Sequence, residues 1–131
     1  MPVNPTISGI SNPPELHEAL QAAQYLSDDG LSTSAYLALA LGKPLLLEGA
    51  PGVGKTEAAK ALSSILGRRL IRLQCYEGID AGAALYEWNY PRQMLAIRQA
   101  GDEYVNIYKD EFLIARPMLD ALQSGGNALL L

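Results

Sequence analysis

The feature that most constrains this chain is the run Gly49–Thr56, which reads Gly-Ala-Pro-Gly-Val-Gly-Lys-Thr. It satisfies the pattern G-x-x-x-x-G-K-[ST] of a phosphate-binding P-loop at every fixed position. Consecutive backbone N–H groups at the start of a helix bind a dense anion, because the unpaired amides and the helix dipole both favour negative charge. We therefore expect a nucleoside triphosphate to bind here.

Each part of this run has an expected role. The glycines allow backbone conformations with positive φ and a close approach to the phosphates. Lys55 is expected to reach the β- and γ-phosphates and is the candidate catalytic residue, while the hydroxyl of Thr56 is the candidate ligand of Mg²⁺. The nucleotide-binding residues that we predict are Gly49, Ala50, Pro51, Gly52, Val53, Gly54, Lys55, Thr56 and Glu57.

The flanking residues favour the P-loop over a glycine-rich turn with an incidental lysine. Residues 44–48, Pro-Leu-Leu-Leu-Glu, form a short apolar run typical of a buried strand. Residues 56–66 have apolar side chains at helical spacing, and Gly67 follows as a helix-ending residue. Strand, glycine loop and helix is the local structure that the motif requires.

Composition limits the remaining function classes. With 131 residues, 49% of them hydrophobic, the chain is long enough for one domain with an ordinary core. A net charge of −4 and no basic cluster beyond Arg68-Arg69 argue against a nucleic-acid partner. No apolar stretch approaches the ~18 residues that a membrane span needs. The N-terminus lacks signal-peptide features and Cys75 is the only cysteine, so we expect a cytoplasmic protein.

Hydrophobic periodicity predicts an α/β protein with a parallel sheet. Helices are expected over residues 15–26, 32–41, 56–66, 94–98 and 112–123, and strands over residues 44–48, 68–75 and 127–131. The order strand, loop, helix, strand is a βαβ unit with a right-handed crossover. Residues 1–14, with four of the eight prolines, are expected to be an extended lead-in to a domain over residues 15–131.

Several other side chains invite a functional interpretation. We expect Cys75 to be a buried strand residue rather than a reactive thiol, and we assign His17 no role. Glu77 and Asp80 are more easily explained as helix-capping residues than as catalytic acids. The aromatic cluster Tyr86, Trp88 and Tyr90 fits either a helix packed on the sheet or an exposed partner-binding insert.

The last predicted strand, residues 127–131, runs to the end of the sequence. A P-loop ATPase needs an acidic residue after such a strand, to hold Mg²⁺ or orient water. A buried strand is a poor place for a chain to end. We therefore expect this sequence to be the N-terminal part of a longer protein, the alternative being a natural terminus that closes the sheet.

Three segments resemble the AAA+ ATPases of the MoxR type. They are the P-loop with its preceding strand, residues 66–80 (Leu-Gly-Arg-Arg-Leu-Ile-Arg-Leu-Gln-Cys-Tyr-Glu-Gly-Ile-Asp), and residues 84–93. Residues 84–93 are similar to the branch linked with maturation of molybdenum-containing carbon monoxide dehydrogenase. The resemblance covers residues 15–131. It implies the P-loop NTPase (AAA+) fold, a parallel-sheet sandwich that is incomplete at its C-terminus, because the acidic pair, sensor residues, arginine finger and helical lid that follow in the family are not in this sequence.

The resemblance also implies a function. The intact protein would bind ATP and Mg²⁺ and hydrolyse ATP. It would assemble into a homo-oligomeric ring, usually a hexamer, and remodel a metalloenzyme client such as a molybdenum-containing dehydrogenase. Two alternatives stay open: a nucleotide-binding module without turnover, and a small-molecule kinase, against which the lack of an arginine-rich lid argues.

Overall fold

The computed structural model describes residues 9–131. The chain divides into two compact units, with the boundary between Leu70 and Ile71, and each is described by itself. Residues 1–8 of the predicted extended lead-in lie outside the described residues. The rest of that lead-in is partly helical, because the first helix already begins at Pro13.

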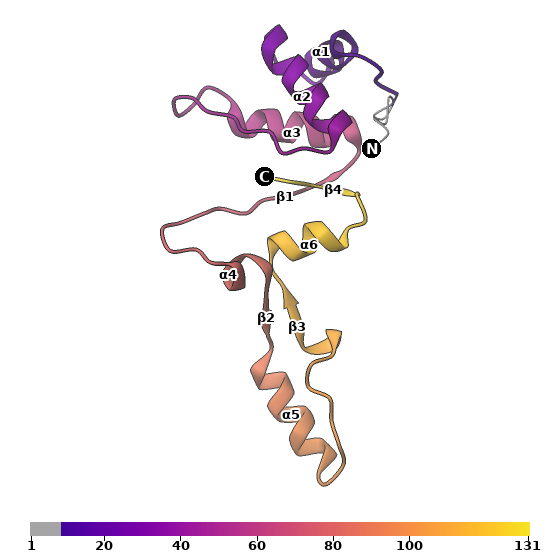
Figure 1. Ribbon diagram of the computed structural model, residues 1–131, viewed down its shortest axis with the longest axis vertical. Coiled ribbons are helices and arrows are strands. Elements are labelled where there is room, and N and C mark those ends of the chain that lie inside the picture. Colours follow the sequence, from indigo (N-terminus) through magenta and orange to yellow (C-terminus); the bar gives the residue numbers. More distant parts are fainter. Residues whose placement is uncertain (1–8) are drawn as a thin grey trace. The chain divides into compact units, whose positions relative to one another are not determined.

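Three helices build the first unit: α1 (Pro13–Ala22), α2 (Asp29–Leu41) and α3 (Lys55–Leu66). Figure 1 shows the chain looping out between α2 and α3 before α3 begins. The side chain of Asn12 caps α1 by accepting a hydrogen bond from the backbone of Glu15, and Asp28 caps α2 in the same way. Gly42 and Gly67 end α2 and α3 in the left-handed conformation, which glycine adopts without a steric penalty.

The core of this unit lies between the three helices. α1 packs against both α2 and α3. The predicted helical spacing over residues 56–66 is confirmed, since α3 buries one apolar face and ends at the predicted residue. The buried apolar residues of the unit are Ile10, Leu16, Leu20, Ala35, Ala40, Ala58, Ala59, Ala61, Leu62 and Leu66.

Three predicted elements of this unit differ from the structure. Residues 44–48 form no strand, and Leu46 is 79% exposed. A strand is stabilised by a ladder of hydrogen bonds to its neighbours, and the strand pairs of the described residues do not include this segment. The first helix ends at Ala22 instead of residue 26. The second begins at Asp29 instead of residue 32, because Asp28 is its cap.

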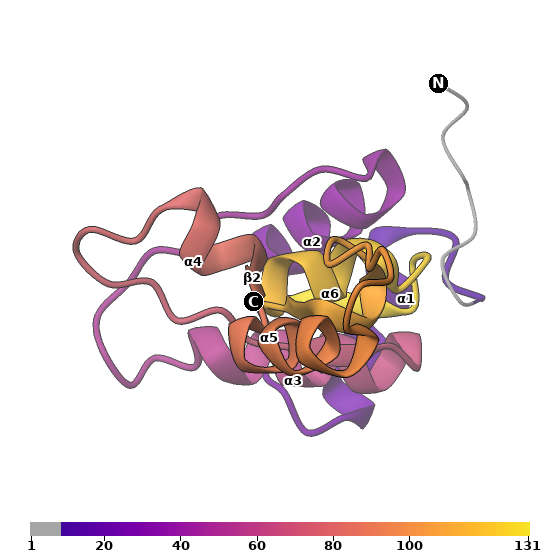
Figure 2. The same ribbon diagram turned by 90° about the horizontal axis from the view of Figure 1, so that it is seen from below.

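Short elements alternate in the second unit. They are the end of β1 (Arg69–Ile71), α4 (Ala81–Leu85), β2 (Tyr86–Trp88), α5 (Tyr90–Ala100), the 3₁₀ turn η1 (Asp110–Phe112), β3 (Leu113–Ala115), α6 (Pro117–Gln123) and β4 (Ala128–Leu130). Figure 2 views this unit with α5 nearest the reader. The buried amide of Gln93 on α5 donates to the carbonyl of Ile107 at 2.6 Å, which ties the helix to the loop that returns from it.

Two strand pairs organise this unit. The N–H of Leu131 donates to the carbonyl of Ile71 at 2.8 Å, and the N–H of Leu73 donates to the carbonyl of Leu131 at 2.7 Å. This is the pattern of parallel pairing. It joins the second and the last of the predicted strands, whereas the predicted βαβ unit of residues 44–48 and 68–75 is not formed, because residues 44–48 are not a strand. β2 and β3 pair antiparallel, with Tyr86 opposite Ala115 and Trp88 opposite Leu113. The fold is therefore mixed helix and strand, with a small parallel pair in place of the full parallel sheet that we predicted.

The helix predicted over residues 112–123 was wrong in its first half. Residues 113–115 form β3, and the helix begins only at Pro117. Proline disfavours the helical conformation in the residue before it but suits the first helical turn. Arg116 is accordingly extended, with a φ of −83° and a ψ of 168°.

The predicted strand over residues 68–75 is shorter than expected. β1 ends at Ile71, and its ladder continues only to Leu73. Cys75 lies beyond the ladder and is exposed, so its prediction as a buried strand residue was wrong. The predicted loop over residues 76–80 is present, and Asp80 caps α4 by accepting from the N–H of Ala83 at 2.8 Å. Capping was the preferred interpretation of Asp80, and the structure confirms it.

Candidate functional site

The P-loop lies entirely in the first unit and leads directly into α3. Gly52 and Gly54 have φ values of +83° and +98°, a region that other residues rarely adopt. Gly54 is the N-cap of α3 and forms no side-chain cap hydrogen bond. The first N–H groups of α3 have no partner within the helix, so this end is suited to an anion.

Close packing within the loop also depends on glycine. A Cβ atom built on Gly49 would lie 3.1 Å from the Cγ2 atom of Val53, which is tighter than ordinary van der Waals contact. The loop therefore folds back on itself with Gly49 next to Val53. The side chain of Val53 is itself 61% exposed.

Lys55 is the first residue of α3, and its side chain bends back over the loop. Its ammonium group donates to the carbonyl of Ala50 at 3.1 Å and also to the carbonyl of Gly49. Both acceptors belong to the P-loop. The ammonium group of Lys55, which is the one cation of the motif, is therefore held against the backbone carbonyls of the loop.

Thr56 and Glu57 follow in the first turn of α3, where an acidic side chain is favoured by the helix dipole. The side chain of Glu57 accepts from the ammonium of Lys60 at 2.8 Å, one turn further along the helix. Thr56 is half-buried at the start of the helix. Its hydroxyl is a hard oxygen ligand of the kind that Mg²⁺ accepts.

Thr56 alone does not make a protein metal site. Among the described residues there is no group of three or more His, Cys, Asp or Glu side chains able to hold a metal ion. Mg²⁺ typically takes one or two protein ligands together with phosphate oxygens and water. The hydroxyl of Thr56 therefore fits Mg²⁺ that arrives with a nucleotide.

Tyr25 contacts the P-loop and was missed by sequence reasoning. Its hydroxyl donates to the carbonyl of Gly54 at 3.2 Å. Its ring lies 3.6 Å from the position that a Cβ atom on Gly54 would occupy. Tyr25 is 29 residues before Gly54 in the sequence, and no pattern in the intervening residues indicates the contact.

A hollow of about 500 Å³ lies beside the P-loop. That volume is in the range of small-molecule sites. Its wall combines polar and apolar side chains and includes both Lys55 and Val53 of the motif. The lining residues are Tyr25, Leu26, Ser27, Asp28, Gly30, Leu31, Ser34, Leu45, Leu46, Leu47, Glu48, Val53 and Lys55.

His17, to which we assigned no role, links α1 to α2. Its Nδ1 atom lies 3.0 Å from the hydroxyl of Ser32 and 3.1 Å from that of Ser27. The two hydroxyls are 2.8 Å apart. Ser32 is almost completely buried, so this polar cluster joins the two helices from within the unit.

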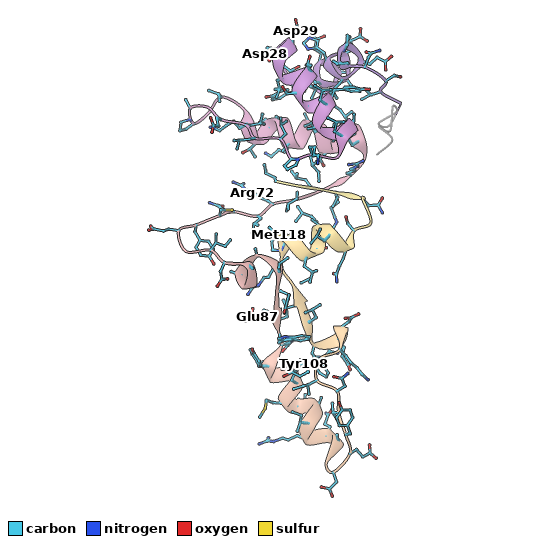
Figure 3. The ribbon with its side chains drawn as sticks, in the orientation of Figure 1. Asp28, Asp29, Arg72, Glu87, Tyr108 and Met118 are labelled. Carbon is cyan, nitrogen blue, oxygen red and sulfur yellow. The ribbon has the colours of Figure 1, made fainter. Side chains whose placement is uncertain are left out.

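The aromatic cluster lies in the second unit. The ring of Trp88 packs edge-to-face with Tyr108 at 5.3 Å and with Tyr86 at 5.9 Å, measured between centroids. Such edge-to-face pairs are favoured by the ring quadrupoles. Tyr90 opens α5 and is 64% exposed. Figure 3 shows Glu87 on β2 and Tyr108 next to the start of α5.

Comparison with known proteins identifies the motif-bearing region. The family of AAA domains of the dynein-related subfamily matches residues 44–112. The uncharacterised protein YojN of Bacillus subtilis (strain 168) is 35% identical over 71 residues, which are 53% of this chain and 23% of that relative. The chain therefore spans less than a quarter of this relative's length. No solved structure matches the chain.

The family match has direct consequences for function. It supports nucleotide binding of the ATPase type and the P-loop NTPase fold. Nucleotide together with Mg²⁺ is the typical requirement of such domains. The helices of the described residues include none with the length and apolar character needed to cross a membrane.

Proposed function

This chain belongs to the AAA domains of the dynein-related subfamily, and from that premise we propose that residues 49–57 bind ATP and that the intact protein hydrolyses it. The observation that carries the proposal is the conformation of the P-loop. Gly52 and Gly54 have positive φ, and the N-terminus of α3 lies directly behind them. That combination places unpaired amides next to a single ammonium group.

The chemical roles follow from this geometry. The amides of Gly52 to Thr56 bind the phosphate oxygens. Lys55 exchanges its hydrogen bonds with the carbonyls of Gly49 and Ala50 for phosphate oxygens, and it neutralises negative charge on the transferring group. The hydroxyl of Thr56 would hold Mg²⁺, which would neutralise further negative charge on the phosphates. The hollow beside the loop offers room for the rest of the nucleotide.

We further propose that the protein is an AAA+ ATPase of the MoxR type, in which residues 15–131 are the N-terminal part of the domain. The support is the resemblance of residues 66–80 and 84–93 to that branch. On this proposal the intact, cytoplasmic protein forms a homo-oligomeric ring. It uses ATP hydrolysis to remodel or mature a metalloenzyme client, such as a molybdenum-containing dehydrogenase.

The second unit offers a surface for that client. Tyr86 and Tyr90 are exposed, as are Met94 and Ile97 on α5. Exposed aromatic side chains are effective anchors at protein interfaces. Trp88, in contrast, is half-buried between Tyr86 and Tyr108, so we assign it a packing role.

Phosphate release is the experiment that tests hydrolysis. The full-length protein should release inorganic phosphate from MgATP with no added acceptor, and Lys55→Ala should abolish the release. If ATP is consumed only when a small-molecule acceptor is added, and its γ-phosphoryl group is recovered on that acceptor with ADP as the other product, the protein is a kinase. If nucleotide binds without any release, the protein is a binding module without turnover, and the proposed ATPase reaction is wrong.

A further inference from the structure

Tyr25 is positioned by the way in which α1 ends. The N–H of Tyr25 donates to the carbonyl of Leu20 at 2.9 Å, and the N–H of Gln24 donates to that of Gln21 at 2.9 Å. These two bonds, with Gln24 at a φ of +62°, are the Schellman arrangement that closes a helix. Among the described residues Gln24 is the only non-glycine with positive φ.

The base of this turn is well packed. Leu16 and Leu20 of α1 are both 1% exposed, and α1 packs against α3 as well as α2. The Schellman turn therefore projects Tyr25 from a well-packed helix toward the start of α3. Tyr25 is half-buried and contributes to the wall of the hollow together with Val53 and Lys55.

The atom that Tyr25 contacts is important for phosphate binding. The carbonyl of Gly54 accepts from the Tyr25 hydroxyl at 3.2 Å and from the N–H of Ala58 at 3.0 Å. The same planar peptide group carries the N–H of Lys55, which points opposite to that carbonyl. The backbone of Gly54 has the wide conformational freedom of glycine. Two hydrogen bonds to its carbonyl therefore restrict the direction of the Lys55 N–H in the same peptide group.

We propose that Tyr25 is a positioning residue of the P-loop: its hydroxyl holds the Gly54–Lys55 peptide so that the Lys55 N–H is directed at a bound phosphate. The inference rests on the proposed nucleotide binding and adds to it a residue outside the motif. Tyr25 does not need to touch the nucleotide for this role. Its effect is to lower the entropy that the loop loses when phosphate binds.

The test compares Tyr25 with Tyr36, two half-buried tyrosines whose hydroxyls donate to different backbone carbonyls. Tyr25→Phe removes the hydroxyl and keeps the ring. Tyr36→Phe is the matched control, because Tyr36 is also half-buried and also donates to a backbone carbonyl, that of Ser11 at 2.7 Å, away from the P-loop. Affinities of the full-length protein for MgADP and for inorganic pyrophosphate are measured by calorimetry. The temperature is one at which circular dichroism shows every variant folded.

We expect Tyr25→Phe to weaken MgADP and pyrophosphate by the same factor, about threefold to tenfold, which corresponds to the loss of one hydrogen bond. Tyr36→Phe should bind both ligands as the unchanged protein does. Unchanged affinity in Tyr25→Phe overturns the inference and leaves the proposed function intact. A loss confined to MgADP also overturns it, because the effect then lies at the base and not at the phosphates. If the unchanged protein binds neither ligand, the proposed function fails and the inference fails with it.

Discussion

The ammonium group of Lys55 donates a hydrogen bond to the carbonyl oxygen of Ala50 at 3.1 Å. This contact joins the first residue of α3 to the loop that precedes it. A lysine at a helix start is free to extend into solvent, and here the fold-back keeps its charge against the backbone of the loop. On the proposed function, the charge of Lys55 and the amide donors of the loop would serve one phosphate site, although they come from a side chain and from the backbone.

Replacing Gly54 with alanine should impair the loop in two ways. Its φ of +98° is strained for any residue with a Cβ atom, so we expect a loss of about 1–3 kcal/mol in the free energy of unfolding. Nucleotide binding should weaken as well, because Gly54 carries the N-cap peptide of α3. Gly67→Ala is the control: it has a φ of +61° at the far end of α3 and open space around it. Denaturation gives the stability of both variants, and calorimetry gives their nucleotide affinity. If Gly67→Ala weakened nucleotide binding as much as Gly54→Ala, this account would be contradicted.

Asp28 and Asp29 are adjacent acidic residues with different roles, and both are labelled at the start of α2 in Figure 3. The Asp28 side chain accepts from the N–H of Leu31 at 2.7 Å. Asp29 lies in the first turn, where the helix dipole favours an acidic side chain. Asp28→Ala should lower the free energy of unfolding by about 1 kcal/mol, and Asp29→Ala by a few tenths. Equal losses in urea denaturation would show that α2 does not depend on this cap.

The ion pair between Glu87 on β2 and Arg116 after β3 should contribute little. The side chain of Arg116 is 44% exposed and that of Glu87 is 48% exposed. Exposed pairs of this kind contribute about 1 kcal/mol or less, and salt screens them. A double-mutant cycle with Glu87→Gln and Arg116→Gln should give a coupling energy in that range that declines at 1 M salt. A coupling above about 2 kcal/mol, insensitive to salt, would contradict this expectation.

Trp88 is the only tryptophan in the chain, so its fluorescence reports on the second unit alone. Its ring packs against Tyr108. Tyr108→Ala should expose the indole to water and shift its emission to longer wavelength. Tyr104→Ala, at a side chain that is 91% exposed, should leave the spectrum unchanged. An identical spectrum in Tyr108→Ala would mean that this aromatic contact does not shield Trp88 in solution.

The parts of the fold that depend on local sequence were predicted well. α3 ends at Gly67 as expected, because helical spacing and a C-terminal glycine are both read from neighbouring residues. The cap of α4 by Asp80 was predicted for the same reason, since it too depends on neighbouring residues. The start of α6 is also specified locally, since Pro117 disfavours the helical conformation at Arg116. The predicted helix over residues 112–123 instead followed the apolar residues before Pro117.

The parts that depend on distant partners were not predicted. Residues 44–48 are apolar enough for a strand, yet strand formation needs a ladder neighbour that no local pattern specifies. The exposure of Cys75 has the same origin, because β1 loses its ladder partner beyond Leu73. Within the site, the spacing of the motif predicts roles for Lys55 and Thr56, and these stay predictions. Tyr25 reaches the loop only through the packing of α1 on α3, which sequence periodicity does not describe.

Nucleotide affinity of Lys55→Ala is the measurement that tests the central claim most directly. The full-length protein should bind MgATP in calorimetry. Lys55→Ala should weaken binding by about tenfold to a hundredfold, as expected for the loss of a hydrogen bond from a charged group, and should remain folded. Lys60→Ala is the control, because Lys60 lies on the same helix, is exposed and forms an ion pair with Glu57. Equal MgATP affinity in Lys55→Ala and the unchanged protein would contradict the assignment of residues 49–57 as the ATP site.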